Sequence, residues 1–306
     1  MEWSQQLARI LNNPPLVEEP MSRHTSLQVG GPADYLVFPR DLEELQAVLL
    51  LAQEKGIPFF VLGHGSNLLV RDEGYRGMVI SLASACSRYD FMEDRVKAGA
   101  AVPLPWLARE FARRGYKGLE FAAGIPGTLG GAIFMNAGAF GSYIGELVIE
   151  VVTMDLQGCC RIRPHTELNF SYRWSNFQDE DVIILEAALA LQPGNREEIE
   201  RNMEDMLNER AARHPHQPSA GSVFRNPPGG AGYLIEQAGL KGMAVGGALI
   251  SPQHGNFIVN TGNATATDVL SLISIARDKV REKFGIELEP EIRVIGGNGK
   301  NRGEIE

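Results

Sequence analysis

The sequence is poor in cysteine and lacks the spacings of common metal and nucleotide sites. Its three cysteines are Cys86, Cys159 and Cys160, with no Cys-x-x-Cys pair, so neither a disulfide framework nor a zinc site is supported. His214 and His216 flank a proline without a neighbouring acid or cysteine, and we expect no metal there. Neither G-x-G-x-x-G nor the Walker pattern G-x-x-x-x-G-K-[ST] occurs, so both standard nucleotide fingerprints are missing.

Long apolar runs and positive charge are also scarce. No apolar run approaches the roughly 18 residues of a membrane-spanning helix. The polar, amphipathic start of the chain does not have the pattern of a signal peptide. The net charge of −9 argues against nucleic acid or an anionic membrane as a partner. We therefore expect a cytoplasmic protein, a monomer, with no nucleic-acid partner and no membrane insertion.

The composition is typical of a globular protein, and the order of its patterns indicates an α+β fold. The 306 residues are 44% apolar and 22% charged, enough for two or three domains. Asp41, with Glu44 three places on, forms a capping-box pattern that begins a helix. Helices are expected at 1–12, 42–55, 103–114, 195–212, 231–238 and 266–284, and strands at 33–38, 58–62, 77–82, 95–100, 147–155, 182–191, 247–250, 256–260 and 291–295.

The most unusual segment is 121–141, which holds six glycines and almost no charge. Because each interior glycine costs a helix about 1 kcal/mol relative to alanine, we expect no ordinary helix there. Glycine has no Cβ, so this backbone can approach a large, flat ligand closely. Two interpretations stay open on this pattern alone: a tight turn between buried strands, or a seat for a cofactor.

A second glycine motif, Gly63-His64-Gly65-Ser66-Asn67, follows an apolar strand pattern. Its backbone and side-chain donors suit an anion such as a pyrophosphate. The spacing departs from the dinucleotide fingerprint because position 68 is leucine. A hairpin turn is therefore an equal alternative.

Three other segments carry polar groups suited to chemistry. Ser222, within 219–227, is suited to act as a nucleophile or proton donor, or it caps a turn. Arg173 lies among the aromatic residues of 170–175, where it can hold a carboxylate in a bidentate fork or stack at the surface. Glu291 begins a strand pattern, where it is either an inward-facing functional acid or an exposed edge residue.

Together and in this order, the segments resemble the family of UDP-N-acetylenolpyruvoylglucosamine reductases. Each motif is weak alone, but seven in order are specific. The length resembles that of the family's short second type. The matching segments are 24–33, 63–70, 121–141, 171–175, 220–227, 234–242 and 288–296, nearly the whole chain.

The resemblance implies a fold and a cofactor. It implies an FAD-binding fold of the vanillyl-alcohol-oxidase (PCMH) type, with two α+β subdomains at 1–76 and 77–194. A C-terminal α+β substrate-binding domain is implied at 195–296, followed by a flexible tail at 297–306. Such a fold holds FAD non-covalently without Rossmann glycines, which accounts for the missing fingerprint. The cofactor-binding residues carried over are Gly63, His64, Gly65, Ser66, Asn67, Gly124, Ile125, Pro126, Gly127, Gly130, Gly131, Asn136, Gly138 and Ala139.

The family's reaction is the NADPH-driven reduction of UDP-N-acetylglucosamine enolpyruvate to UDP-N-acetylmuramate in peptidoglycan synthesis. By resemblance, Ser222 matches the proton-donating serine, Arg173 the arginine that stabilises the enolate, and Glu291 the acid beside it. Arg225 departs from the family pattern, where lysine is common, and Gly255 stands where alanine is usual. The substrate contacts carried over are Tyr172, Arg213, Asn226, Tyr233, Lys241 and His254.

Two functions other than that of the reductase family are open to this sequence. A related flavin oxidase or dehydrogenase acting on another small substrate would show rapid reaction of its reduced flavin with oxygen and no preference for the UDP-sugar. A non-catalytic flavin- or nucleotide-binding protein is the other alternative. The expected residue types at all three catalytic positions argue against it.

Overall fold

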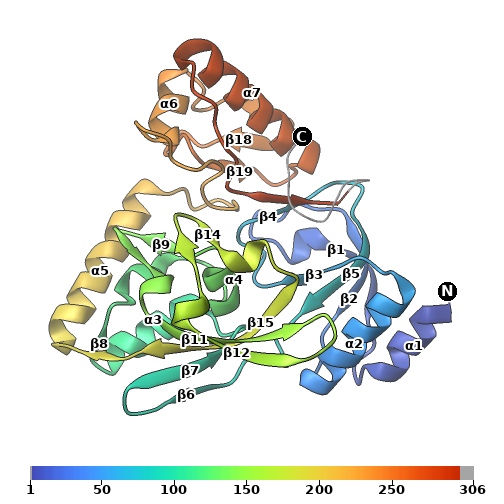
Figure 1. Cartoon of the computed structure of the whole chain (residues 1–306). Coiled ribbons are helices and arrows are strands. Elements are labelled where there is room, and N and C mark those ends of the chain that lie inside the picture. Colours follow the sequence, from blue (N-terminus) through green and yellow to red (C-terminus); the bar gives the residue numbers. More distant parts are fainter. Residues whose placement is uncertain (1, 297–306) are drawn as a thin grey trace. The chain divides into compact units, whose positions relative to one another are not determined.

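The computed structural model describes residues 2–296 (Figure 1), so the predicted flexible tail at 297–306 lies outside the described residues. The chain forms two compact units, each assembled from separate stretches of sequence. The first comprises the residues up to Leu16, Leu36–His64 and Val79–Arg210. The second comprises Val17–Tyr35, Gly65–Met78 and the chain from Ala211 onward. Within 2–296, no helix has both the length and the apolar character needed to cross a membrane.

A five-stranded antiparallel sheet, in the order β12-β11-β15-β7-β6, forms the centre of the first unit. The central strand β15 is apolar and buried over most of its length, as expected for a strand covered on both faces. The short helix α4 packs against β7 and β15 (Figure 1). The five strands are β6 (Tyr89–Phe91), β7 (Arg95–Gly99), β11 (Val148–Asp155), β12 (Cys160–Pro164) and β15 (Val182–Ala190).

The helices α1, α2, α3 and α5 of the first unit begin within a residue of where the sequence predicts. At the start of α2, the Asp41 side chain accepts a hydrogen bond from Glu44 N at 2.9 Å, which confirms the predicted cap. Glu44 does not complete the capping box, because its carboxylate accepts from Arg40 N at 2.9 Å instead. The helices are α1 (Glu2–Ile10), α2 (Leu42–Lys55), α3 (Leu104–Arg113), α4 (Leu129–Phe134) and α5 (Arg196–Arg213), the last extending into the second unit.

The second unit has its own apolar core beneath α6 (Ala231–Gln237) and α7 (Ala266–Phe284). The predicted apolar stripe of α7 is confirmed, since Val269, Ile273 and Ala276 are buried in this core. Thr265 and Asp268 form a capping box at its start, which the sequence reading missed. A three-stranded antiparallel sheet completes the layer: β17 (Ala244–Val245), β18 (Ala248–Ile250) and β19 (Ile258–Asn260).

Among the remaining strands, β2, β3, β5 and β20 were predicted, but most of the others have only two or three residues and leave no periodic pattern. β4 (Leu68–Val70) and β20 (Arg293–Ile295) form a parallel pair in the second unit. A four-stranded sheet has the order β1 (Leu16–Pro20), β2 (Pro32–Val37), β5 (Tyr75–Ser81) and β3 (Phe59–Leu62). Two-stranded pairs join β8 (Tyr116–Lys117) to β16 (Gln192–Pro193), β9 (Gly138–Ala139) to β10 (Ser142–Tyr143), and β13 (Phe170–Ser171) to β14 (Trp174–Ser175).

The expectation that 121–141 contains no ordinary helix is wrong for one part of it. α4 includes both Gly130 and Gly131, and Thr128 caps it by accepting a hydrogen bond from Gly131 N at 3.3 Å. A Cβ on Gly130 would lie 2.7 Å from the Ala100 Cβ, so glycine is needed here for close packing on the neighbouring backbone. This packing and the cap offset the intrinsic helix cost of glycine.

Candidate active site

The two glycine motifs meet at Thr128 in the first unit. A Cβ placed on Gly63 would lie 2.8 Å from Thr128 Oγ1, and one on Gly131 would lie 3.5 Å from the same atom. The turn after β3 therefore lies directly against the start of α4. Sequence reasoning assigned both segments to one cofactor but could not show that they are neighbours.

The predicted cofactor residues divide into two groups by exposure. Gly63, His64, Pro126 and Gly131 are exposed, and Gly124, Ile125 and Gly127 are partly exposed, in a region otherwise lined by buried side chains. In contrast, Gly130 and Gly138 are buried and pack on protein atoms, and Ala139 pairs with Ser142 between β9 and β10. In the first group, Gly63, Gly127 and Gly131 present backbone without Cβ atoms, which fits the close approach of a flavin dinucleotide; the second group shapes that backbone.

Asn136, predicted to bind the cofactor, forms side-chain hydrogen bonds within the first unit. It is buried, and its side-chain amide donates to Ser171 O at 2.8 Å and accepts from Gly145 N at 3.1 Å. Its backbone has φ of 43°. Its amide group thus joins the glycine-rich segment to the 170–175 segment.

The second half of the Gly63–Asn67 motif, from Gly65 onward, belongs to the second unit. Gly65 O accepts a hydrogen bond from Ser26 N at 3.1 Å. Asn67 donates through its side chain to Glu291 O at 3.1 Å, and Asn67 O accepts from Arg293 N at 3.1 Å. Asn67 therefore holds the segment that carries the candidate acid, Glu291, just before β20, while Gly65 is bonded to Ser26 and Ser66 is partly exposed.

Ser222 and Glu291 come together in the second unit through main-chain hydrogen bonds. Glu291 N donates to Val223 O at 2.7 Å, and Arg225 N donates to Glu289 O at 2.9 Å. Burial lowers the pKa of the neighbouring Arg293 guanidinium. The predicted proton donor and the predicted acid, distant in sequence, are thus neighbours in the fold.

Asn256 braces this pairing, and sequence reasoning missed it. Its buried side chain accepts from Phe224 N at 2.9 Å and donates to Phe224 O at 2.8 Å, while Asn256 O accepts from Val223 N at 2.9 Å. Its position in His254-Gly255-Asn256, next to a predicted substrate contact, was the available signal.

Arg173 lies at the tip of the hairpin formed by β13 and β14 in the first unit. Its backbone has φ of 55°, in the left-handed region. Its guanidinium lies 5.2 Å from the centre of the Tyr172 ring, within the range of a cation–π contact. The tip thus presents the two residues predicted to stabilise and contact the substrate.

A second arginine near Arg173, Arg210 of α5, was missed by sequence reasoning. A Cβ on Gly124 would lie 2.6 Å from the Arg210 side chain, so this arginine packs on the start of the glycine-rich segment. Burial, and secondly the charge of Arg173, lower the pKa of Arg210. No sequence signal marks it, because α5 carries many charged residues of both signs.

Three predicted substrate contacts, Lys241, His254 and Arg213, gather in the second unit. Burial, followed by the charge of Lys241, lowers the pKa of His254, and Arg213 acts in the same direction. The His254 ring also lies 5.6 Å from the His214 ring. Lys241 Nζ pairs with Glu236 at 2.9 Å.

Of the other two predicted contacts of this unit, Tyr233 lies in α6 and Asn226 shortly before it. Tyr233 is 60% exposed. Asn226 accepts from Ala231 N at 3.1 Å, which fixes the start of the helix. Among residues 2–296, no group of three or more His, Cys, Asp or Glu side chains could hold a metal ion.

Comparison with known proteins identifies the family. A family model described as UDP-N-acetylenolpyruvoylglucosamine reductase, C-terminal domain, matches residues 213–295, and an FAD binding domain model matches residues 33–160. The UDP-N-acetylenolpyruvoylglucosamine reductase of Heliobacterium modesticaldum is 48% identical over 297 residues, covering 96% of this chain and 95% of its own. The Caldanaerobacter subterraneus enzyme of that name is 47% identical over 283 residues, covering 92% and 93%.

The chain belongs to the UDP-N-acetylenolpyruvoylglucosamine reductase family. The crystal structure of a family member from Thermus caldophilus is 40% identical to it and superposes with a TM-score of 0.80, covering 92% of this chain and 99% of that one. The expected α+β fold class and the FAD cofactor are confirmed.

The two family models match different parts of the chain, and the candidate residues are distributed unevenly between them. The FAD binding domain match spans both glycine motifs, and the C-terminal match spans Ser222, Glu291 and Asn256. The stretch between them, 161–212, carries Arg173 and Arg210 and lies outside both.

Proposed function

We propose that this chain reduces UDP-N-acetylglucosamine enolpyruvate to UDP-N-acetylmuramate, with FAD as its non-covalent cofactor and NADPH as the reductant, in peptidoglycan synthesis. The observation that supports this best is the main-chain bond of 2.7 Å from Glu291 N to Val223 O, which joins the predicted acid to the residue after Ser222. It brings the segment of the predicted acid against the segment of the predicted proton donor. The names of the relatives support the substrate and the pathway.

The chemistry makes defined demands on these residues. When bound, FAD supplies a hydride, taken from NADPH, to the terminal vinyl carbon of the substrate. Negative charge then develops on the adjacent carbon and spreads into the substrate carboxylate, so cationic stabilisation and a proton are required. We assign the proton to the Ser222 hydroxyl, because the carbanion that it protonates is strongly basic. We assign stabilisation of the enolate to Arg173, with Glu291 acting beside it.

Arg210 supports an anionic ligand near Arg173. Two guanidinium groups close enough to interact repel one another, and the pKa of Arg210 is lowered accordingly, after the larger effect of burial. A carboxylate or phosphate placed between such groups would offset this repulsion. We therefore add Arg210 to the proposed anion-binding residues.

The remaining assignments follow the division by exposure. We propose that the open backbone at Gly63, His64, Gly124–Gly127 and Gly131 contacts FAD. Lys241, His254 and Arg213 are proposed to face the nucleotide phosphates, and Tyr172, Tyr233 and Asn226 to contact the sugar nucleotide. We further propose that residues 1–76 and 77–194 form the two FAD-binding subdomains, that 195–296 form the substrate-binding domain, and that the enzyme acts in the cytoplasm as a monomer.

An absorbance spectrum of the purified protein tests the proposed function. The protein should be yellow, NADPH should bleach the flavin bands under anaerobic conditions, and the enolpyruvyl sugar nucleotide should restore them. A protein that is bleached by NADPH but is reoxidised only by oxygen would contradict the proposal and favour an oxidase.

A further inference from the structure

The hairpin that carries Arg173 is too small to hold its own shape. β13 and β14 pair through two residue pairs, Phe170 with Ser175 and Ser171 with Trp174. An isolated two-stranded hairpin is at best marginally stable in water, even with longer strands. Arg173 also has φ of 55°, in the left-handed region that residues other than glycine rarely adopt. Bonds from outside the hairpin must therefore set the position of Arg173.

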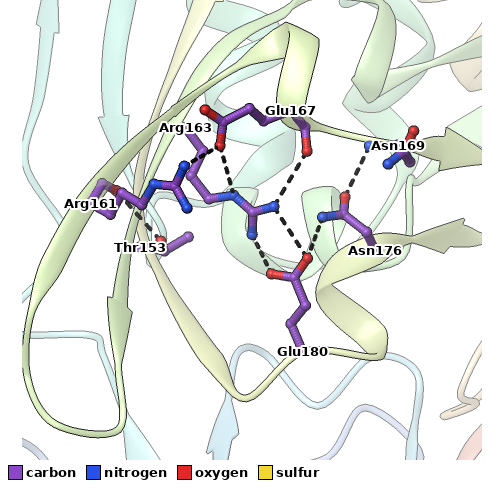
Figure 2. Close-up of polar contacts among 7 residues, drawn as sticks. All are labelled: Thr153, Arg161, Arg163, Glu167, Asn169, Asn176 and Glu180. Carbon is purple, nitrogen blue, oxygen red and sulfur yellow. Dashed lines mark hydrogen bonds and ion pairs between the residues drawn. The ribbon is translucent and has the colours of Figure 1, made fainter.

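A polar network fixes the base of the hairpin (Figure 2). Asn169 N donates to the Asn176 side chain at 2.9 Å, and Asn176 N donates to Asn169 O at 3.1 Å. The Asn176 amide in turn donates to Glu180 at 2.6 Å, and Arg163 is also bonded to Glu180. Burial alone would raise the pKa of Glu180, but the hydrogen bonds from Arg163 and Asn176 lower it, so this carboxylate stays charged.

A second set of bonds joins the hairpin to the glycine-rich segment. Ser175 Oγ donates to Phe134 O at 2.7 Å, and Asn136 donates to Ser171 O at 2.8 Å. Phe134 ends α4, and Asn136 follows it by two residues. The hairpin is therefore attached to the end of α4, the helix that carries Gly131, which is proposed to contact the flavin.

Gln178 is the one side chain of this group whose amide bonds both to the glycine-rich segment and to Arg173 itself. Its Nε2 donates to Phe134 O at 2.8 Å and to Arg173 O at 3.2 Å. Because both partners are carbonyl oxygens, only the NH₂ end of the amide fits here, and its two hydrogens satisfy both. The bond to Arg173 O acts directly on the residue with the left-handed backbone.

We propose that Gln178 is a positioning residue for Arg173: it holds the carbonyl of Arg173 at a fixed place relative to the end of α4, and so sets the guanidinium relative to the proposed flavin seat. This inference rests on the proposed function. Gln178 itself contacts no reacting atom. Its effect should therefore appear in the half-reaction that uses Arg173 and vanish when Arg173 is absent.

Single-turnover kinetics of the holoenzyme test this inference. Gln178→Met removes both donors at similar volume and should slow reoxidation of the reduced flavin by the enolpyruvyl substrate by roughly 10–10²-fold, the scale expected for a misplacement of about 1 Å. Flavin content and bleaching by NADPH should stay at wild-type levels. Gln178→Asn, whose amide is one methylene too short to reach both carbonyls, should slow the same step. Gln192→Met, at an exposed glutamine of β16, is the matched control and should match wild type.

A double-mutant cycle separates positioning from general destabilisation. In an Arg173→Ala background, Gln178→Met should change the reoxidation rate by less than about twofold, because coupled residues are not additive. Ser175→Ala, which removes the other bond to Phe134 O but none to Arg173, should slow reoxidation less than Gln178→Met.

Three results would overturn the inference. They are wild-type reoxidation by both Gln178 variants, the same slowing with and without Arg173, or loss of bound flavin in Gln178→Met. Each of these results would overturn the inference even if the wild-type enzyme is reoxidised by the substrate. Failure of the wild-type enzyme to be reoxidised by the substrate would instead reject the proposed function.

Discussion

The surroundings of Ser222 and Glu291 differ from those of Arg173 in what holds them. In the second unit, the segment after Ser222 and the segment of Glu291 are joined by main-chain bonds, from Glu291 N to Val223 O and from Arg225 N to Glu289 O. In the first unit, the Arg173 hairpin is attached to neighbouring segments by side-chain bonds, namely those of Asn136, Ser175 and Gln178. The candidate catalytic residues therefore depend on two different kinds of support.

This difference predicts how each region responds to substitution. A main-chain hydrogen bond persists when the side chain changes, so replacing Ser222 should remove its hydroxyl without moving its neighbours. A side-chain bond is lost with the side chain, so replacing Gln178 should move Arg173, whose carbonyl it holds. The first region should show clean chemical effects, and the second should show coupled ones.

The largest expected effect comes from Ser222→Ala. NADPH should still bleach the flavin, because this step needs no proton from Ser222. Reoxidation by the enolpyruvyl substrate should be slower by roughly 10²–10⁴-fold, the usual contribution of a positioned general acid. Anaerobic stopped-flow absorbance measures both steps, and the melting temperature should match that of the wild type.

Two outcomes would count against this reading. Reoxidation of Ser222→Ala at the wild-type rate would show that another group supplies the proton. A melting temperature well below that of the wild type would show that the serine side chain supports the local fold, and the contrast with the Arg173 hairpin would then disappear.

The second prediction concerns Asn256, whose side chain braces the Ser222 region. Asn256→Ala leaves both Phe224 N–H and Phe224 C=O without this partner in a buried site. At about 1–3 kcal/mol for each unsatisfied group, the free energy of unfolding should fall by about 2–6 kcal/mol. Asn176→Ala at the hairpin base, where Glu180 and Gln178 are partly exposed, should cost about 1 kcal/mol.

Urea unfolding of the flavin-saturated proteins compares the two asparagine variants. The order matters more than the absolute values: Asn256→Ala should be the less stable, and Asn176→Ala should be the slower in substrate-driven reoxidation relative to its loss of stability. Equal stability losses with equal loss of activity would mean that the two regions are supported alike.

The sequence could predict the elements that have long periodic patterns. The helices now seen as α2 and α7 were predicted within a residue or two, because their apolar stripes and end signals agree. Most strands of two or three residues were missed, since so few residues leave no periodic pattern, but β18, β19 and β20 lie within predicted strands. The helix α4 was excluded on glycine content, yet packing on Ala100 and the Thr128 cap outweigh that preference.

The site residues that lie in recognisable motifs could be predicted from the sequence. Those that join the site only through contacts made in the fold could not. Ser222, Arg173 and Glu291 were chosen because their segments resemble the family. Arg210 and Gln178 were not chosen, since each acts through a contact with a segment that is distant in the sequence: Arg210 packs on Gly124, and Gln178 bonds to Phe134 O. Asn136 was assigned to the cofactor, whereas its amide is bonded to Ser171 and Gly145.

The smallest predicted effect limits the contrast between the two regions, because the second unit also contains groups that interact through side-chain charge. Burial, and then the charge of Lys241, lower the pKa of His254 in the folded protein. Below a pH of about 6.5 the unfolded chain binds a proton at this histidine while the folded protein does not, so stability falls as the pH falls toward the lower folded pKa.

His254→Gln removes this titration and isolates its contribution. The melting temperature of the wild type, measured relative to His254→Gln, should be constant above about pH 7 and should decrease as the pH is lowered below about 6.5. Lys241→Met should reduce this decrease without abolishing it, because burial is the larger cause of the lowered pKa. A difference between wild type and His254→Gln that does not change with pH would show that His254 titrates alike in both states. The second unit would then show no dependence on these side-chain charges, and its support would rest on the main chain and Asn256.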